Sequence, residues 1–268
     1  MTVSDLSMVR ETLAGVIVTG GASGIGFATA QQLARGNASV VVCDLEDPAQ
    51  GIDGVDFLTG DVRDPTTIER AVSKIGGRVR ALVLCAARGP LYRDSTEIVQ
   101  TNHHAQIENA LACQEALVEW ASVVTLSSTA GFRVYMDNKW LRLVGEPYAG
   151  ERNLELWAEI AAMSPRDAYA LSKWAVNSST MRLGRILASK RVRVNCVAPG
   201  PTRTKMSEAL WRERPNEWSH LAKEAPVGLA NEPDDVATVI EWLCTDAARM
   251  VFGSILHVDG GWKVSHVD

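Results

Sequence analysis

The sequence lacks the features that would tie a protein to a membrane, to secretion or to a disulfide scaffold. Its 268 residues include five cysteines, which lie far apart without a CxxC pair, so neither disulfides nor a thiolate metal site are expected. No apolar run reaches the roughly 18 residues that a membrane span needs. The amino-terminal stretch also has no apolar segment of the kind found in secretory signals. We therefore expect a cytoplasmic protein that does not enter a membrane.

Basic charge is also scarce. The chain carries 27 Lys and Arg against 32 Asp and Glu, a formal net charge of −5, and has no basic block. A nucleic-acid-binding protein needs cationic side chains to hold phosphates, so binding to DNA or RNA is not expected. The 46% of apolar residues can instead build a sizeable core.

Short apolar runs rich in β-branched residues recur along the chain. They alternate with stretches of helical spacing, of which 96–119 is the longest. The runs are 16–19, 39–43, 55–58, 81–84, 122–126, 192–196 and 255–258. Strands of this kind are buried on both faces and, with crossover helices between them, form a parallel sheet. The sequence predicts a single α/β domain with a Rossmann-type, doubly wound parallel sheet.

Two stretches interrupt this alternation. Residues 132–168 follow the fifth predicted strand and contain an amphipathic segment at 151–163, whereas residues 201–228 follow the sixth. Ligands bind beyond the carboxyl ends of strands in open α/β sheets. We therefore expect 132–168 to be a helical insertion before the helix of Tyr169, and 201–228 to be a lid that binds substrate.

Tryptophan dominates the few aromatic residues, with eight Trp against four Tyr and four Phe. Four of the eight fall in the two interruptions, at Trp140, Trp157, Trp211 and Trp218. An indole offers a large apolar area with one polar group. Trp211 and Trp218 are therefore predicted to contact an apolar substrate, whereas Trp157 could equally bury a subunit contact or core.

The turn after the first strand resembles a dinucleotide-binding loop. Residues 19–26 read TGGASGIG and lead directly into a helix, whose amino terminus would face a pyrophosphate. Asp44, at the end of the second strand, stands where an acid hydrogen-bonds a ribose diol. A carboxylate there would repel a 2′-phosphate, so NAD is predicted over NADP. The alternative is that Asp44 serves only its own turn.

A phenol and an ammonium lie four residues apart, at Tyr169 and Lys173, which places both on one face of a helix. Interconversion of a carbonyl and an alcohol needs a hydride carrier and an acid or base at the substrate oxygen. A nearby ammonium lowers the pKa of a phenol. The pair is therefore a candidate acid/base centre, although the same spacing is also common on ordinary helix surfaces.

In combination these motifs resemble the short-chain dehydrogenase/reductase family. The segments that carry the resemblance are TGGASGIG at 19–26, Asn102, Ser127-Ser128, Tyr169-xxx-Lys173, Pro199-Gly200 and Val258-Asp259-Gly260-Gly261. They span nearly the whole chain apart from 132–168. The resemblance implies one NAD-binding domain over residues 1–268 and, as is usual in the family, a homodimer or homotetramer.

The resemblance also implies roles for single residues. Tyr169 would be the acid/base, Ser128 would donate a hydrogen bond to the substrate oxygen, and Lys173 would lower the pKa of Tyr169 and bind the nicotinamide ribose. Asn102 would hold a water that links Lys173 to solvent. The residues implied to contact the cofactor are Gly20, Ser23, Gly24, Ile25, Gly26, Asp44, Leu45, Asp61, Val62, Cys85, Ala86, Tyr169, Lys173, Pro199, Gly200, Thr202 and Thr204.

One segment departs from the family pattern. Most relatives carry Asn-Asn-Ala-Gly after the fourth strand, but residues 84–90 of this chain read LCAARGP. This segment and the long separation of Ser128 from Tyr169 resemble bacterial 3α-hydroxysteroid dehydrogenase/carbonyl reductases, and coniferyl-alcohol dehydrogenases are similar. In the steroid enzymes the insertion is helical and contributes to subunit contact, which implies a comparable role for 132–168.

The resemblance thus implies an NAD-dependent oxidoreductase that interconverts a secondary alcohol and a ketone on a bulky apolar substrate, such as a 3α-hydroxysteroid. The alternatives are a dehydrogenase of aryl or allylic alcohols or of cyclic diols, and a catalytically silent NAD-binding module. A serine hydrolase is disfavoured because the sequence has no GxSxG elbow. No metal site is expected, since adjacent His103 and His104 would point about 100° apart on a helix.

Overall fold

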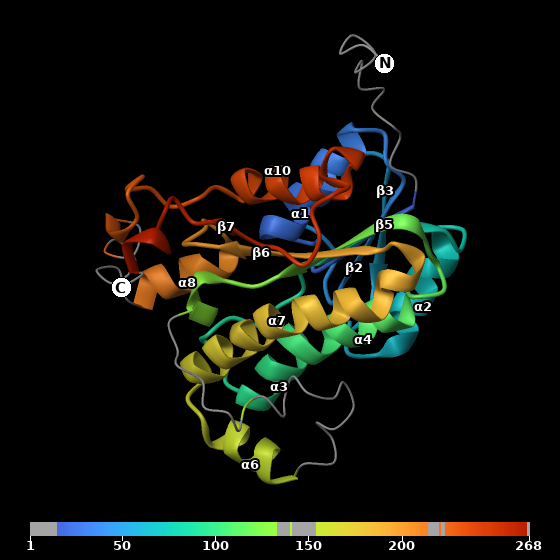
Figure 1. Cartoon of the computed structure of the whole chain (residues 1–268). Coiled ribbons are helices and arrows are strands. Elements are labelled where there is room, and N and C mark those ends of the chain that lie inside the picture. The colour runs from blue at the N-terminus through green and yellow to red at the C-terminus, as the bar shows by residue number, and fades with distance from the viewer. Residues whose placement is uncertain (1–14, 133–139, 141–153, 214–219, 221–222, 267–268) are drawn as a thin grey trace.

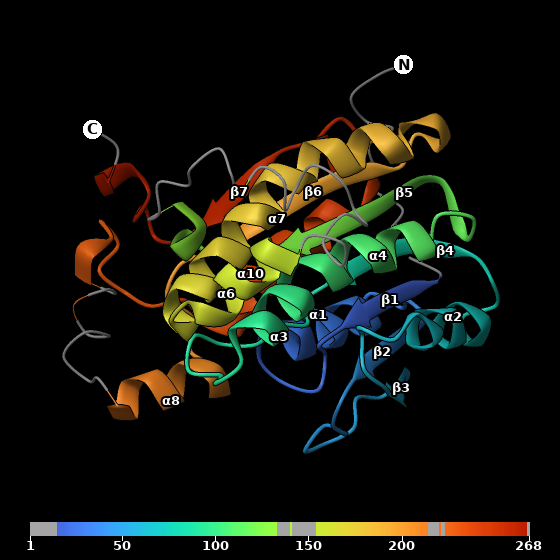
Figure 2. The ribbon, with the colours of Figure 1, turned by 90° about the horizontal axis from the view of Figure 1, so that it is seen from below.

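The computed structural model describes residues 15–132, 140, 154–213, 220 and 223–266. These residues form a parallel sheet of seven strands in the order β3-β2-β1-β4-β5-β6-β7, with helices on both faces, as Figure 1 and Figure 2 show. The strands are β1 (Val16–Thr19), β2 (Val40–Asp44), β3 (Val55–Thr59), β4 (Val79–Leu84), β5 (Leu117–Leu126), β6 (Arg193–Pro199) and β7 (Ile255–Val258). Each predicted apolar run matches one of these strands, with at most one residue outside it. The predicted Rossmann-type α/β fold is confirmed.

The helices form one layer on each face of the sheet. α1 and α10 pack together on one face, whereas α2, α4 and α7 cover the other (Figure 1). The helices are α1 (Gly24–Arg35), α2 (Pro65–Lys74), α3 (Ser95–Val99), α4 (Ala105–Ala112), α6 (Leu154–Ala162), α7 (Pro165–Leu187), α8 (Lys205–Glu213) and α10 (Pro233–Cys244). The helix predicted over 96–119 is shorter, because α4 ends at Ala112 and β5 already begins at Leu117. Within this helical stretch a π-helical turn, η2 (Gln100–His104), joins α3 to α4.

The strands are buried on both faces because successive side chains point to opposite sides of the sheet. Ile17 and Leu82 join the core under α2, α4 and α7, whereas Val18 and Val83 join the core under α1 and α10. Burying a side chain of this size contributes about 1.5–3 kcal/mol. The two cores hold the sheet firmly, and its carboxyl edge is therefore a fixed platform for a site.

The described part of the stretch 132–168 includes α6, which packs against α3 and α7. Leu156 and Ile160 of α6 are buried in a third apolar cluster, and Trp140 is buried in the same cluster. Trp157 packs against this cluster, with its indole 5.2 Å from the ring of His104. Trp157 thus covers part of the chain's own core, and only the remaining exposed part of its indole could contact a partner or a substrate.

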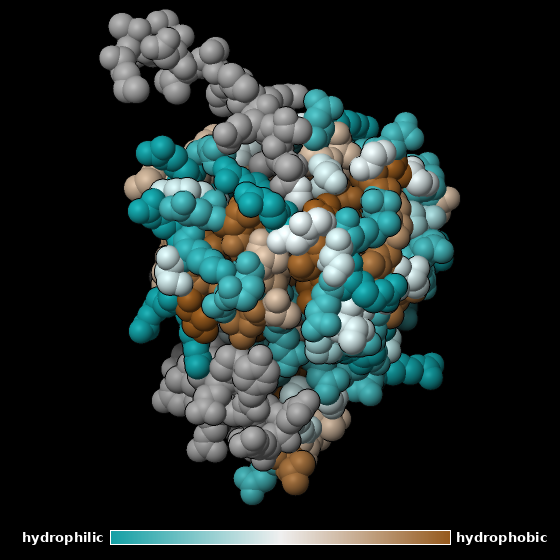
Figure 3. All heavy atoms as spheres, turned by 90° about the vertical axis from the view of Figure 1, so that its right-hand side faces the viewer, coloured by the Kyte–Doolittle hydropathy of each residue, from teal (hydrophilic) through white to brown (hydrophobic). Residues whose placement is uncertain are grey.

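Hydrophobic side chains also reach the surface. Figure 3 shows the side of the molecule on which α7 ends, where hydrophobic patches are framed by hydrophilic side chains. Met181 of α7 is exposed, and the ring of Phe252 lies over Gly184, where an added Cβ would come within 2.9 Å of it. A Cβ at Gly253 would touch Met181 at 3.5 Å, so Met181 and Phe252 form one apolar surface. In the part of the chain that the structure describes, no helix is both long and apolar enough to cross a bilayer.

Candidate active site

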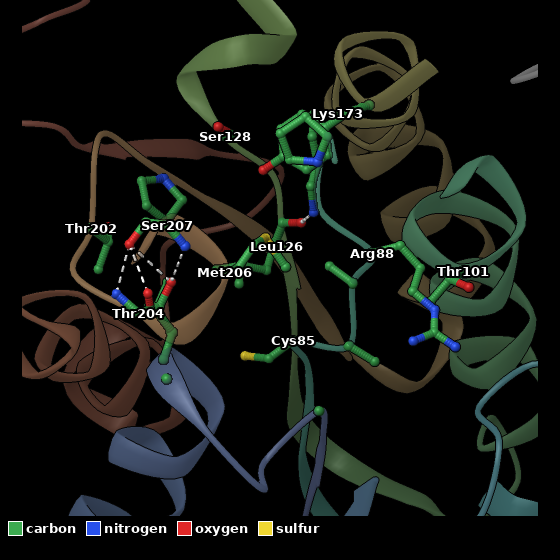
Figure 4. Close-up of a pocket in the computed structure, with 18 of the residues that line it drawn as sticks. Cys85, Arg88, Thr101, Leu126, Ser128, Lys173, Thr202, Thr204, Met206 and Ser207 are labelled. Carbon is green, nitrogen blue, oxygen red and sulfur yellow. Dashed lines mark hydrogen bonds between the residues drawn. The ribbon is translucent and has the colours of Figure 1, made fainter. Parts of the chain in front are cut away.

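A cavity of about 570 Å³ lies at the carboxyl ends of the strands. It is lined by the turn after β1, by the segments that follow β2 to β6, and by the beginnings of α7 and α8 (Figure 4). Every residue that was expected to contact the cofactor lines this cavity, and so does Ser128. The fold therefore brings residues from seven separate segments of the sequence to one place.

The turn after β1 needs glycine for two reasons. Gly20 has a φ of +70°, and a Cβ on it would lie 2.5 Å from the backbone nitrogen of Ala86. A Cβ on Gly26 would lie 2.2 Å from the Gly20 carbonyl oxygen, so α1 approaches the turn too closely for any side chain. The amino terminus of α1 consequently sits at the cavity wall, where its free N–H groups can bind an anion.

Asp44 connects the end of β2 to this glycine-rich turn. Its Oδ2 accepts a hydrogen bond from the Ala22 N–H at 2.8 Å, and its Oδ1 accepts one from the Leu45 N–H at 2.7 Å. The carboxylate also lines the cavity. Asp44 therefore serves its own turn and faces the ligand space at once, so the two interpretations of this residue do not exclude each other.

A network of charged side chains lies beside the segments after β3 and β4. Arg63 binds both carboxylate oxygens of Asp61, at 3.1 and 2.6 Å, and holds the pKa of Asp61 below its ordinary value. Glu97 pairs with Arg63 at 2.9 Å and with Arg88 at 3.2 Å, and the Arg88 guanidinium stacks 4.6 Å from the ring centre of Tyr92. The network therefore connects the Asp61 side of the cavity to residues 84–90, the segment that departs from the family pattern.

Ser128, Tyr169 and Lys173 line the chemical end of the cavity. Ser128 follows β5, whereas Tyr169 and Lys173 lie one turn apart on α7, with the Lys173 Nζ 5.7 Å from the centre of the Tyr169 ring. Ser128 lies near enough to the Tyr169 phenol to lower its pKa. All three functional groups therefore face the same end of one cavity.

Burial dominates the ionisation of this end. It raises the pKa of Tyr169, against which the hydrogen bond from Ser128 acts, and it lowers the pKa of Lys173 to about 8. The pKa of Tyr169 was expected to be lowered, but in the protein alone it is raised, because desolvation of the phenolate outweighs the favourable hydrogen bond. A positive charge brought by a ligand would be needed to reverse the direction.

Asn102 is fully buried in the π-helical turn and does not line the cavity. Its Oδ1 accepts a hydrogen bond from the Arg88 N–H at 2.7 Å, and its Nδ2 donates to the Arg88 carbonyl at 3.0 Å and to Ser172 Oγ at 3.1 Å. The side chain thus fixes the segment after β4 to α7. That Asn102 holds a water linked to Lys173 stays a prediction.

The first turn of α8 closes over the cavity. Thr204 and Ser207 cap it reciprocally, because the Thr204 N–H donates to Ser207 Oγ at 2.8 Å and the Ser207 N–H donates to Thr204 Oγ1 at 3.3 Å. Met206 reaches across to Gly89, where an added Cβ would come within 2.7 Å of Met206 Cγ. Figure 4 shows Met206 and Ser207 at the cavity beside Thr204.

The tryptophans predicted to contact substrate are not among the described residues of the cavity wall. The Trp211 indole lies against the Arg203 guanidinium, 5.8 Å from ring centre to Cζ, while Met206 and Leu210 present the cavity face of α8. The start of α8 at Lys205 decides which side chains face the cavity. Met206 and Leu210 are four residues apart and share one helix face, whereas Trp211 is one position further on and points to another side. Trp218 lies outside the described residues.

Sequence reasoning also missed several lining residues. They come from the segment after β4, from η2 and from the start of α7, and they include Arg88, Pro90, Leu91, Thr101, Arg166 and Asp167. The signal for Arg88 and Pro90 was their place in the segment 84–90, which departs from the family pattern. Arg166 and Asp167 could have been found from their position one turn before the predicted acid/base pair.

Cys85 lines the cavity but is not a reactive thiol, because burial raises its pKa to about 12. The other four cysteines are buried as well. Among the described residues, no three His, Cys, Asp or Glu side chains are grouped so that they could hold a metal ion.

Two family models match the chain. The model described as short chain dehydrogenase matches residues 14–139, and the model described as enoyl-(acyl carrier protein) reductase matches residues 153–263. The two matches leave only residues 140–152, within the insertion, between them. Together they cover both the glycine-rich turn and the Tyr169 and Lys173 pair.

Individual relatives agree with these models. The chain is 29% identical to a 3-alpha-hydroxysteroid dehydrogenase/carbonyl reductase of Comamonas testosteroni, over 92% of this chain and 95% of that protein. It is 28% identical to a tropinone reductase homolog of Arabidopsis thaliana, over 96% and 95% of the two chains. The crystal structure of a 3-alpha-hydroxysteroid dehydrogenase from Pseudomonas sp. B-0831, complexed with NADH, superposes with a TM-score of 0.78 at 28% identity and covers 93% of this chain and 96% of that one.

Proposed function

Since the chain belongs to the short-chain dehydrogenase/reductase family, we propose that it interconverts a secondary alcohol and a ketone with NAD as its cofactor. The observation that carries this proposal is one cavity that holds both ends of the chemistry. The glycine-rich turn lies on one wall, and Ser128, Tyr169 and Lys173 lie on another. A protein that only bound a nucleotide would have no need of the second set.

The residues at the turn fit a dinucleotide. Gly20 and Gly26 leave the backbone bare, so a pyrophosphate can approach the amino terminus of α1. The Asp44 carboxylate lies on the same wall, where it can accept hydrogen bonds from a ribose diol and would repel a 2′-phosphate. These features support NAD over NADP.

A nicotinamide cofactor held by the glycine-rich turn and Asp44 would supply the hydride for reduction of the carbonyl carbon. The Tyr169 hydroxyl donates its proton to the carbonyl oxygen as charge develops there, and the Ser128 hydroxyl donates a hydrogen bond to the same oxygen. The Lys173 ammonium, 5.7 Å from the Tyr169 ring centre, stabilises the phenolate that remains. In the direction of oxidation, the phenolate takes the alcohol proton.

The substrate space favours a bulky, largely apolar molecule. Pro90, Leu91, Met206 and Leu210 line the cavity together with Ala170. A flat apolar ring system would bury well against such side chains. A 3α-hydroxysteroid meets this description, and two of the similar proteins are named 3-alpha-hydroxysteroid dehydrogenases.

The test is a screen of the purified protein with NADH and NADPH against steroid, aryl and alicyclic ketones, followed by the absorbance of the reduced cofactor. We expect turnover with NADH on at least one bulky ketone and slower turnover with NADPH. Tight NADH binding without turnover on the whole panel would instead favour a silent binding module. Faster turnover with NADPH would contradict the role given to Asp44.

We also infer that the protein is a homodimer or homotetramer that buries the apolar surface of Met181 and Phe252. Monomeric proteins rarely leave contiguous apolar surface exposed without a function. Sedimentation equilibrium should give two or four times the chain mass of 29.0 kDa, and Met181→Glu should shift the mass toward that of the monomer. A monomeric wild-type protein would contradict this inference.

A further inference from the structure

The side chain of Gln106 reaches from α4 to the end of β5. Its Nε2 donates to the Asn102 carbonyl at 2.8 Å and to the Leu126 carbonyl at 3.2 Å, and its Oε1 accepts a hydrogen bond from the Leu126 N–H at 3.2 Å. The orientation of the amide is fixed by chemistry, because a backbone N–H only donates and a carbonyl only accepts. Gln106 is buried, so these bonds are made out of contact with water.

The Leu126 carbonyl is also the acceptor for Lys173. The Lys173 Nζ donates to this oxygen at 2.9 Å, and the Lys173 side chain is almost completely buried. A buried ammonium is stable only where hydrogen-bond acceptors replace its water. The position of the Leu126 carbonyl therefore governs where the Lys173 charge lies. Gln106 binds both backbone polar groups of Leu126, its N–H and its carbonyl, and so holds the two peptide groups on either side of this residue.

The other end of the Gln106 amide is held by the π-helical turn. In η2 the Ala105 N–H bonds to the Gln100 carbonyl, five residues back. A π-helical turn shifts the regular helical bonding pattern, and within this turn the Asn102 carbonyl accepts the Gln106 side chain. The turn thus sets the distance between α4 and the end of β5, next to Lys173.

We propose that Gln106 is a positioning residue for the proton-transfer step, which acts by fixing the Leu126 carbonyl that holds Lys173. This inference rests on the proposed function, in which Lys173 serves Tyr169. The Gln106 amide and the Leu126 carbonyl link the Asn102 carbonyl to the Lys173 ammonium. Neither group releases a proton near neutral pH, so this link positions Lys173 and does not itself conduct protons.

The test compares Gln106→Leu with Ser122→Ala. Gln106→Leu removes three buried hydrogen bonds to the backbone and Ser122→Ala removes one. Ser122 donates to the Leu243 carbonyl, on the other face of the sheet from Lys173. The readout is the pH midpoint of Lys173 acylation by acetic anhydride, measured by mass spectrometry on the folded protein. Gln106→Leu should lower this midpoint, because the Leu126 carbonyl that accepts from the ammonium is no longer held in place. Ser122→Ala should leave the midpoint at the wild-type value.

A second variant keeps the test decisive if Gln106→Leu does not fold. Gln106→Glu places a carboxylate near Lys173, which favours the ammonium, so its midpoint should rise. In an active enzyme, Gln106→Leu should also lower kcat on the order of 10- to 100-fold, as displaced catalytic groups do, while KM for NADH changes little.

Two failures can be told apart. If the wild type turns over no ketone, the proposed function fails, but the acylation midpoints still test the link from Gln106 to Lys173. If the folded Gln106 variants and Ser122→Ala all keep the wild-type midpoint, Gln106 does not position Lys173 and this inference is overturned.

Discussion

At the cofactor end of the cavity the chain presents mainly backbone, whereas at the chemical end it presents side chains that other buried side chains hold in place. The turn of Gly20 and Gly26 is bare and is tied down by Asp44 from the next strand. Lys173, by contrast, depends on the Leu126 carbonyl, which in turn depends on Gln106. The difference teaches that changes at the first end should alter binding, and changes at the second should alter turnover.

The largest effect is expected from Tyr169→Phe. Removal of the hydroxyl takes away the proton donor, so kcat should fall about 10²- to 10⁴-fold, while the dissociation constant of NADH stays nearly the same. Tyr92→Phe is the matched control, since its hydroxyl bonds Glu97 and lies outside the proposed chemistry. Full turnover in Tyr169→Phe would mean that the chemical end of the cavity does not supply the proton, and would contradict the distinction between the cofactor end and the chemical end.

Lys173 offers a test of the buried chemical end by stability. Its pKa is lowered from 10.5 to about 8, so between these pH values the unfolded chain binds more protons than the folded one, and the free energy of unfolding rises with pH. Lys173→Met removes this linkage. We expect the variant to be more stable than the wild type at pH 7 by on the order of 1–3 kcal/mol, a gap that narrows from pH 8 to 10.5.

Chemical denaturation at several pH values measures this gap. Lys190→Met is the control, because that lysine lies at the surface and pairs with Glu115 at 3.0 Å. A gap that does not change with pH would mean that the Lys173 ammonium is not penalised by burial.

At the cofactor end, Asp44→Asn should alter binding without altering chemistry. The amide cannot accept from a ribose diol as well as a carboxylate and no longer repels a 2′-phosphate. The ratio of kcat/KM for NADH to that for NADPH should fall about tenfold, which corresponds to a loss of about 1.4 kcal/mol. Asp47→Asn, which changes a carboxylate bonded to Thr59 Oγ1 at 2.9 Å, should leave the ratio unchanged. Equal ratios in both variants would argue against Asp44 as the selector.

The smallest effect is expected from Gly89→Ala, which tests the lid between the two ends. The new methyl group would lie 2.7 Å from Met206 Cγ, and a flexible Met side chain can move aside at a cost of about 1 kcal/mol. KM for the ketone should rise a few-fold with kcat unchanged. Gly51→Ala is the control, since nothing lies within 4 Å of its added Cβ. A larger effect on kcat than on KM would show that the lid takes part in the chemistry.

The cofactor end could be predicted from the sequence because it is built from local motifs at strand ends. Parallel strands bring their carboxyl ends to one edge, so the turn at 19–26, Asp44 and Asp61 had to meet there. Gln106 could not be recognised, because its partner Leu126 lies on another element and only the folded structure brings them together. Its one signal was a Gln placed four residues after Asn102, one helical turn away.

The lid resisted prediction for a different reason. Whether Trp211 or Leu210 faces the cavity depends on a rotation of about 100° per residue, and therefore on the residue at which α8 begins. Composition identified this stretch as unusual, but the helix phase was fixed by the reciprocal caps of Thr204 and Ser207, which a count of tryptophans does not register.

Cys85 sits in the wall of a cavity proposed for redox chemistry, yet its pKa is raised to about 12 by burial. Peroxides and electrophiles attack the thiolate, and at neutral pH this thiol is almost entirely protonated. Cys43, Cys113 and Cys244 share the same raised pKa of about 12. In the folded protein the Cys85 thiol should therefore react only slowly with peroxides and electrophiles, although it lies at the cofactor site.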